Sequence, residues 1–219
     1  MKKVPNLFER DWNGDKSKVL PQLHGGADVA WVLEGHGNPT VKWDGSACLI
    51  KDGVLFVRYD AKRGKKPPPG FMPAQEPDEK TGHHPGWIPS DGPAAKWHVM
   101  ALINSDPMVD SHPHRSSLDD GTYEAVGPHH QSNPYSFDND ILLRHGTHHL
   151  PQRFPADFPS VRSAFNWLRH FLTEYRFAIM GMPAAMGIEG IVWHHESGDG
   201  RMVKVLSSDL GVTWRAKPR

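Results

Sequence analysis

Four short segments of the sequence place a lysine or a glutamate at a strand or a strand edge, where packing neither demands nor favours a charge. They are KWDG at residues 42–45, TYEAVG at 122–127, EGIVWH at 189–194 and MVKVL at 202–206. A lysine amine attacks phosphorus only when it is unprotonated, and nearby cations and partial burial favour that form. Carboxylates bind the divalent ion that neutralises a triphosphate, and a second lysine adds fixed positive charge in the transition state. The set therefore suits phosphate chemistry.

The elements that must hold these segments are mostly strands. Asp52-Gly53 between two β-forming runs predicts a hairpin over 47–58. Other apolar or alternating runs predict strands at 29–33, 97–103, 121–126, 141–144, 188–195 and 201–206. The order favours an α+β fold with mostly antiparallel sheets.

Two other stretches have a clear local pattern. Residues 64–93 are rich in Pro and Gly and predict a long surface loop. Apolar residues at helical spacing from Val161 to Tyr175 predict a helix that Ser160 caps and that ends before Met182-Pro183. We see no internal repeat, so we expect a single domain over 1–219.

Composition narrows the class of protein. The chain has 219 residues, no apolar run long enough for a membrane helix, and no apolar segment near its start that would indicate a signal peptide. Its single cysteine, Cys48, suits a reducing compartment, so we expect a cytoplasmic protein. The 25 basic and 25 acidic residues balance, which excludes a strongly basic nucleic-acid footprint overall. A local basic cluster remains, formed by Lys62, Arg63, Lys65 and Lys66.

Each of the four segments is weak support alone, but their ordered combination resembles the covalent nucleotidyltransferases, which include ATP-dependent ligases and mRNA capping enzymes. Lys42-Trp43-Asp44-Gly45 matches the K-x-D-G of motif I, and Arg58 stands where motif Ia has its arginine. Glu124, Glu189-Gly190 and Lys204 match motifs III, IV and V. The chain is most similar to the RNA ligase 1 family, in LFVRYD, TYEAVGPHHQSNPY, ILLRHG and IEGIVWH, and the resemblance runs from about residue 30 to 215.

The resemblance implies an ATP-dependent RNA ligase built on one nucleotidyltransferase domain of antiparallel sheets with flanking helices. Lys42 would attack the α-phosphate of ATP and form a lysyl-AMP. AMP would then pass to an RNA 5′-phosphate, and a 3′-hydroxyl would displace it. The implied cofactors are ATP and Mg²⁺ or Mn²⁺, and the implied partner is RNA with a 5′-phosphate and a 3′-hydroxyl. The sequence indicates no membrane association and no obligate protein partner.

The same resemblance implies the site residues. The nucleotide-binding residues would be Lys42, Asp44, Gly45, Arg58, Glu124, His145, Glu189 and Lys204. Asp44 would lie near the ribose and the lysine, Glu124 would accept from a ribose hydroxyl, and His145 would stack on adenine. Glu189 would hold the metal, and Lys204 would contact the α-phosphate. Arg58 would contact the ribose or the RNA 5′-phosphate, and RNA would also contact Lys62, Arg63, Lys65 and Lys66.

The sequence departs from the family pattern in three ways. Motif V often has paired lysines, but Met202 and Leu206 flank Lys204 here, so Lys204 serves alone or Arg201 assists it. No R-x-D-K motif VI follows, and we expect no OB-fold domain. Two alternatives stay open: a non-ligating module of the same fold that binds nucleotides or RNA ends, and a guanylyltransferase.

Other conspicuous residues favour structural roles. The 15 histidines include four adjacent pairs, but adjacent histidines in a strand point to opposite faces, and no cysteine pair or H-E-x-x-H accompanies them. We therefore do not expect a structural zinc site. Trp31, Trp43 and Trp167 are expected to pack in the core, and Cys48 to be a small buried strand residue.

Overall fold

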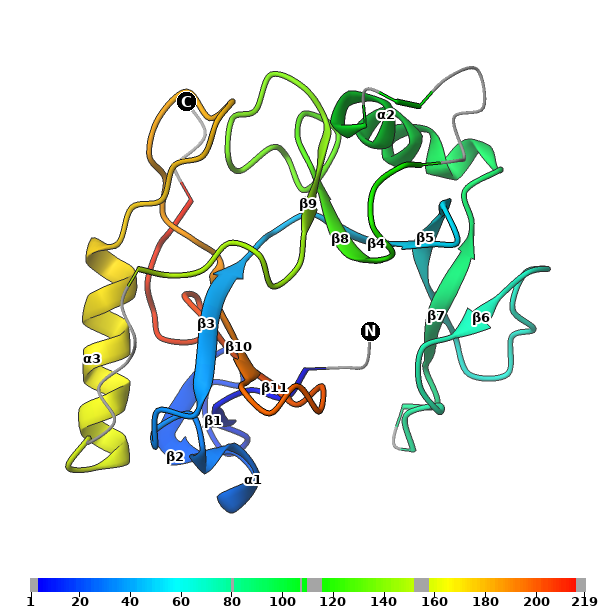
Figure 1. Cartoon of the computed structure of the whole chain (residues 1–219). Coiled ribbons are helices and arrows are strands. Elements are labelled where there is room, and N and C mark those ends of the chain that lie inside the picture. The colour runs from blue at the N-terminus through cyan, green and yellow to red at the C-terminus, as the bar shows by residue number, and fades with distance from the viewer. Residues whose placement is uncertain (1–3, 80, 107, 110–115, 152–157, 216–219) are drawn as a thin grey trace. The chain divides into compact units, whose positions relative to one another are not determined.

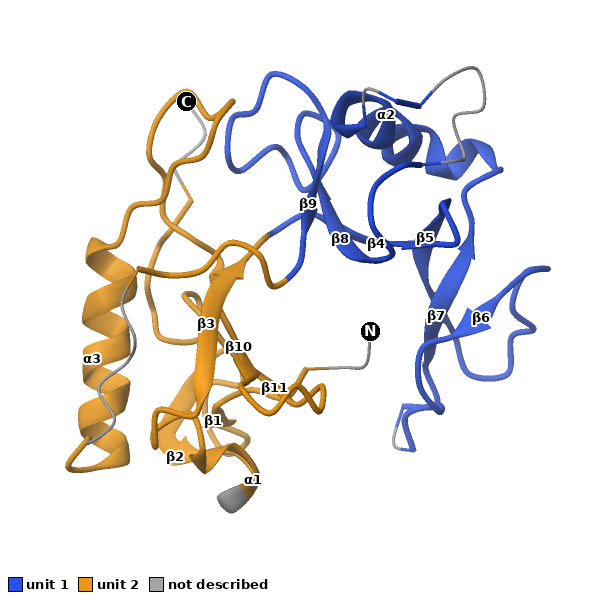
Figure 2. Cartoon of the chain, viewed as in Figure 1, with its two compact units in different colours: residues 1–3, 44–145 blue, residues 4–43, 146–219 orange. Residues whose placement is uncertain are grey.

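The computed structural model describes residues 4–79, 81–106, 108–109, 116–151 and 158–215. Its elements are mixed α and β, and every pairing of its named strands is antiparallel. The chain divides into two compact units, coloured in Figure 2, and each is described by itself. Unit 1 contains Asp44–His145, and unit 2 contains Val4–Trp43 and Gly146–Arg219. A division of this kind is compatible with one domain or two, so the single domain stays a prediction.

Unit 1 is built on a six-stranded sheet with the order β6-β7-β5-β4-β8-β9. The strands are β4 (Ser46–Lys51), β5 (Val54–Ala61), β6 (Met72–Pro73), β7 (His84–Pro89), β8 (Gly121–Val126) and β9 (Ile141–Arg144), labelled in Figure 1. A short 3-10 helix, η1 (Pro93–Ala95), leads into helix α2 (Lys96–Ser105). Ala101 and Leu102 of α2 pack on Cys48, Ile50 and Leu55, so α2 covers one face of this sheet.

Unit 2 is built on a three-stranded sheet with the order β11-β10-β3. Its strands are β3 (Gly37–Lys42), β10 (Gly190–His195) and β11 (Met202–Leu206). A two-stranded sheet, β1 (Phe8–Arg10) with β2 (Val19–Leu23), and two helices, α1 (Ala27–Ala30) and α3 (Val161–Glu174), complete it. Helix α3, yellow in Figure 1, is amphipathic and buries Ala164, Leu168 and Leu172.

The hairpin and four other strand predictions are confirmed. β4 and β5 form the predicted hairpin, and Asp52 and Gly53 both have the positive φ that its tight turn requires. β8 and β9 match their predicted bounds, β10 begins two residues later than predicted, and β11 begins one residue later. Ser160 caps α3 by accepting a hydrogen bond from the amide of Ser163. The helix ends at Glu174 because the backbone of Tyr175 is extended, well before the predicted end at Met182.

Three element predictions are wrong. Residues 97–103 lie in helix α2, because their nearly continuous apolar run has no period that separates a buried helix from a buried strand. Residues 29–33 lie in α1 and the turn after it, where the Trp31 indole donates to the carbonyl of Asp28. The predicted loop 64–93 contains β6, β7 and part of η1, and its prolines in β6 and β7 stand at or next to strand ends, where a missing N–H disturbs the ladder least.

Candidate active site

The three-stranded sheet of unit 2 carries its charged residues on one face. Residues paired directly across an antiparallel sheet point to the same side. Thr40 and Lys204 are both paired with Val192 of the central strand, and Lys42 is paired with Gly190 two residues along. Lys42 and Lys204, from the two outer strands, therefore share a face.

The opposite face of this sheet is apolar and buried. Val41, Ile191 and Trp193 point to it from β3 and β10, together with Val203 and Val205 from β11, and each is less than 5% exposed. This burial fixes the register, because a slip of one residue would turn both lysines into the core. The fold thus holds Lys42 and Lys204 on the more accessible side.

Lys42 and Glu189 form an ion pair at the end of β3. The Nζ atom of Lys42 lies 2.5 Å from Oε2 of Glu189 and 3.3 Å from the carbonyl oxygen of Trp43. The two side chains are 25% and 19% exposed, so a molecule from solvent can still reach the pair. Glu189 is 147 residues from Lys42 in the chain, and β10 brings it there by pairing Gly190 with Lys42.

Gly190 has a steric role next to this pair. A Cβ atom on Gly190 would lie 2.1 Å from the carbonyl oxygen of Val205, which no real side chain could tolerate. The residue after Glu189 must therefore be glycine for β10 and β11 to approach each other here. The Glu-Gly of this segment combines a carboxylate beside Lys42 with the close backbone contact that positions it.

The backbone of Lys204 is held at the outer edge of β11. Its amide donates to the carbonyl of Pro5, and its carbonyl accepts from the amide of Leu7, so the segment before β1 covers the outer edge of β11. Arg201, which the sequence offered as an alternative aid to Lys204, lies before β11 in an exposed turn. Its Nε atom is 2.7 Å from the Asp199 carboxylate, which holds the guanidinium at that turn.

Trp43 anchors the residue after Lys42. It is 2% exposed, and its ring makes edge contacts with His148 and Phe177. Residues 148–150 also pair with the free edge of β3, through the amide of Val41 and the carbonyl of His148. Trp31 and Trp43 are thus packing residues, as predicted, while Trp167 is half-buried.

Unit 1 has its own polar cluster, around Glu124 in β8. Oε1 of Glu124 accepts from the amide of Gly45 at 3.0 Å, and Oε2 lies 2.8 Å from Nε2 of His145. Gly45 and His145 stand near the two ends of the continuous segment Asp44–His145 that forms unit 1. A single buried carboxylate therefore contacts both ends of that segment.

His145 is placed beside Glu124 but its proposed stacking role is untested. Its side chain is 20% exposed, and its Nδ1 atom is buried with no hydrogen-bond partner among the described residues. The Nε2 contact with Glu124 orients the ring by its edge. The adenine-stacking role stays a prediction.

The backbone of the Asp44-Gly45 turn is also fixed within unit 1. The amide of Asp44 donates to the hydroxyl of Tyr135 at 2.8 Å. A Cβ atom on Gly45 would lie 2.2 Å from the carbonyl oxygen of Ala125, so only glycine fits there. Sequence reasoning missed Tyr135, and the signal that could have found it is its position in TYEAVGPHHQSNPY, a run quoted only for its likeness to a family.

Arg58 lies on the same face of the six-stranded sheet as Glu124. The pairings Ala47 with Glu124 and Leu49 with Phe56 put these residues and Arg58 on the face opposite to α2. The Arg58 guanidinium lies 5.2 Å from the centre of the Trp87 ring, and burial lowers its pKa while the charge of Asp60 opposes that shift. Arg58 is in the middle of β5 rather than at its end.

The predicted RNA-contacting cluster follows β5. Lys62, Arg63, Lys65 and Lys66 are all exposed, in a turn closed by a hydrogen bond from the amide of Lys65 to the carbonyl of Lys62. The cluster thus meets the first requirement for a phosphate-binding surface, which is access to solvent.

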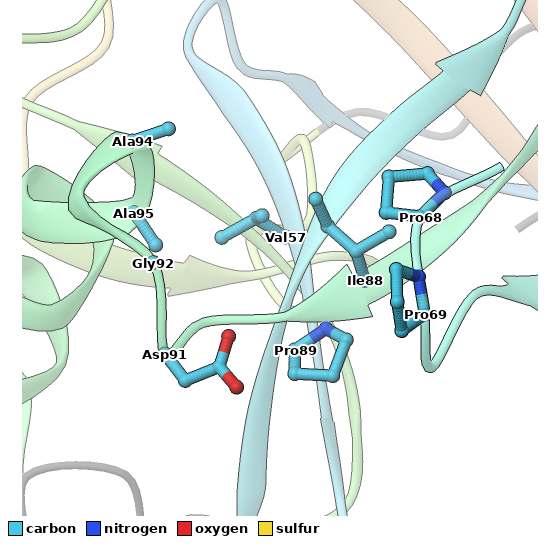
Figure 3. Close-up of a pocket in the computed structure, with 9 residues that line it drawn as sticks. All are labelled: Val57, Pro68, Pro69, Ile88, Pro89, Asp91, Gly92, Ala94 and Ala95. Atoms are coloured by element: carbon cyan, nitrogen blue, oxygen red, sulfur yellow. The ribbon is translucent and has the colours of Figure 1, made fainter.

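A pocket of about 290 Å³ opens elsewhere in unit 1 (Figure 3). Its walls come from Val57 and Ile88, which are paired in β5 and β7, and from the proline-rich loop before β6 and the start of η1. Val57 points to the face opposite to Arg58, because the two are adjacent in one strand. None of the predicted site residues lines this apolar pocket.

No group of three or more His, Cys, Asp or Glu side chains in the described part of the chain is arranged to hold a metal ion. Glu189 is the one carboxylate beside Lys42 that the sequence assigned to a metal. A single carboxylate is a usual protein contribution to Mg²⁺, which keeps several waters and binds substrate phosphates. The donor set therefore fits a metal ion that arrives with a nucleotide.

Cys48 is fully buried, and burial raises the pKa of its thiol, so it is no nucleophile.

Comparison with known proteins adds no family to these observations. No protein-family model matches the chain, and no curated protein matches it. In the residues that the structure describes, no helix is long and apolar enough to cross a membrane.

Proposed function

We propose that the protein is an ATP-dependent RNA ligase that acts through a lysyl-AMP intermediate. The observation that carries this proposal is the Lys42–Glu189 pair, on the sheet face that also presents Lys204. An accessible amine, a carboxylate and a second lysine are the groups that nucleotidyl transfer to lysine requires. The matched order of KWDG, TYEAVG, EGIVWH and MVKVL supports the same activity.

In the first step, the uncharged Nζ of Lys42 attacks the α-phosphorus of ATP. The new N–P bond forms as the bond between the α-phosphorus and the β-phosphate oxygen breaks, and pyrophosphate leaves with that electron pair. The amine would first give up a proton to water. Glu189, the ion-pair partner of Lys42, would bind the cation, and Lys204 would neutralise charge on the α-phosphate.

Glu189 would hold Mg²⁺ or Mn²⁺ together with water and the phosphates of ATP. When bound, the ion supplies positive charge that offsets the charge of the triphosphate and of the departing pyrophosphate. By the family resemblance, Asp44 and Glu124 would bind a nucleoside, with His145 against adenine. These assignments follow the family resemblance, and the contacts of each residue are compatible with them.

In the second and third steps AMP passes to an RNA 5′-phosphate, and an RNA 3′-hydroxyl then displaces AMP. Arg58 and the exposed cluster Lys62, Arg63, Lys65 and Lys66 would contact the RNA phosphates.

We also propose that the two large sheets belong to a nucleotidyltransferase fold. The single buried cysteine supports a cytoplasmic location.

The decisive experiment is transfer of label from α-labelled ATP to the protein, read on a denaturing gel with Mg²⁺ or Mn²⁺. Wild type is expected to become labelled, and neither Lys42→Ala nor Lys42→Arg is. Lys42→Arg keeps the positive charge beside Glu189 but offers no uncharged nucleophile. Lys51→Ala, which removes an exposed lysine of β4, is the matched control and should label fully.

The outcomes separate the three candidate functions. ATP labelling followed by joining of RNA that carries a 5′-phosphate and a 3′-hydroxyl supports the ligase. Labelling by GTP and not ATP would identify a guanylyltransferase. No covalent label from either nucleotide, with RNA ends still bound, would mean a binding module.

A further inference from the structure

The loop between β8 and β9 has an unusual backbone. Gln131, Ser132, Asn133 and Ser136 all have positive φ, between 47° and 60°. A backbone conformation with positive φ is unfavourable for residues other than glycine, and asparagine tolerates it best among these four residues. Several such residues in one short loop persist only where the surrounding contacts over-determine them, and such sites are often functional.

Side chains within the loop hold this conformation. The Asn133 side chain makes two hydrogen bonds to the backbone of Phe137. Its Nδ2 donates to the carbonyl of Phe137, and its Oδ1 accepts from the amide of the same residue. Asp140 accepts from the amide of His129 and contacts its imidazole at 2.7 Å. The loop is therefore closed at its tip and at its base.

The group that this loop presents is the hydroxyl of Tyr135. The side chain is 1% exposed, and its oxygen accepts the amide proton of Asp44 at 2.8 Å. The next amide, of Gly45, donates to Glu124. Two consecutive amides thus donate to side chains of β8 and of the β8–β9 loop, at the start of the segment Asp44–His145. The backbone around Asp44 is consequently held in one conformation.

We propose that Tyr135 is a positioning residue for nucleotidyl transfer, acting through Asp44. By fixing the Asp44 amide, it fixes the direction in which the Asp44 carboxylate leaves the backbone, and so the orientation that this carboxylate offers to a bound nucleotide. The inference rests on the proposed function for its catalytic consequence, and on the Tyr135–Asp44 hydrogen bond for its geometry.

The first test compares two variants that each lose one buried tyrosine hydroxyl in unit 1. Tyr135→Phe removes the contact with Asp44. Tyr123→Phe is the matched control, because the Tyr123 hydroxyl donates to the carbonyl of Asp119 and Tyr123 is also nearly fully buried. At saturating ATP, the single-turnover rate of protein labelling is expected to fall roughly 3- to 10-fold for Tyr135→Phe, the loss typical of one hydrogen bond.

Tyr123→Phe should label at the wild-type rate, even where it lowers the melting temperature as much as Tyr135→Phe does. The ATP concentration for half-maximal rate should change less than about twofold in Tyr135→Phe. The lost hydrogen bond is proposed to stabilise the transition state and not to tighten the binding of ATP in the ground state. Equal labelling rates for the two variants would overturn the proposal.

A second test needs no catalytic activity. Amide hydrogen exchange of Asp44 in the wild-type protein should be much slower than that of Lys66 in its exposed loop. It should accelerate in Tyr135→Phe and remain slow in Tyr123→Phe. An Asp44 amide that exchanges in wild type as fast as that of Lys66 would disprove the positioning contact, whatever the labelling shows. If the wild type takes no label but Asp44 is protected as described, the proposed function fails while the contact stands.

Discussion

At the scale of single residues, the chemistry proposed for this protein depends on where Lys204 points. On β11, the neighbours two residues away on the same face are Met202 and Leu206, and both are uncharged. Lys204 therefore supplies the positive charge of that strand face by itself. Arg201 is out of phase with it and is held by Asp199.

We accordingly expect Lys204→Ala to slow single-turnover protein labelling by ATP on the order of 10²–10³-fold, the loss typical of one preorganised charge contact. Lys204→Arg should recover only part of the rate, because a planar guanidinium does not replace a compact ammonium at a crowded phosphate. Arg201→Ala is the control and should lose much less. A larger loss of labelling rate for Arg201→Ala than for Lys204→Ala would show that Arg201, and not Lys204, supplies the positive charge at the α-phosphate.

At the scale of elements, the glycines that follow two of the charged residues are required by strand packing. Gly190 permits the approach of β10 to β11, and Gly45 permits the approach of the Asp44-Gly45 turn to β8. In both places an added Cβ would meet a backbone oxygen, which cannot move aside as the end of a flexible side chain could. In each pair the acidic residue serves the proposed chemistry, and its glycine serves the packing.

Gly190→Ala should lower the free energy of unfolding by about 1–3 kcal/mol, the usual cost of overpacking. Gly92→Ala is the matched control, since a Cβ on Gly92 would meet nothing within 4 Å. It should change stability by less than about 0.5 kcal/mol. Urea unfolding with unchanged m-values measures both, and equal stability of the two variants would contradict the steric role of Gly190.

The same scale shows what the sequence could and could not predict. The β4–β5 hairpin is local, and Asp52-Gly53 specifies its turn, so it was predictable. Helix α2 was not, because the apolar run from Trp97 to Ile103 lacks a distinguishing period and becomes a helix through its packing on the sheet. The pairing of β3 with β10 joins residues about 150 positions apart, and only the resemblance linked Lys42 with Glu189 in advance. Tyr135 ends the run TYEAVGPHHQSNPY, but that run does not indicate its contact, because the hydrogen bond is to a distant amide.

At the scale of the whole molecule, the proposed RNA binding has to be reconciled with a chain that has equal numbers of acidic and basic residues. A neutral protein has no net long-range attraction for a polyanion, so affinity must come from a local surface. In unit 1 the exposed Lys62, Arg63, Lys65 and Lys66 form such a surface directly after β5, the strand that carries Arg58.

Replacing these four residues with glutamine should weaken binding of single-stranded RNA and flatten its salt dependence. If all four contact phosphates, the slope of log K against log salt should fall by about 3, since each contact with a single strand contributes about 0.7. The control replaces Lys16, Lys18, Arg162 and Arg169, which are also exposed but lie in unit 2, and which change the net charge equally. A fall that is the same in both variants would mean that only net charge matters. An unchanged slope in the first would make residues 62–66 an ordinary solvated turn, and RNA contact would then have to come from other surfaces of the protein.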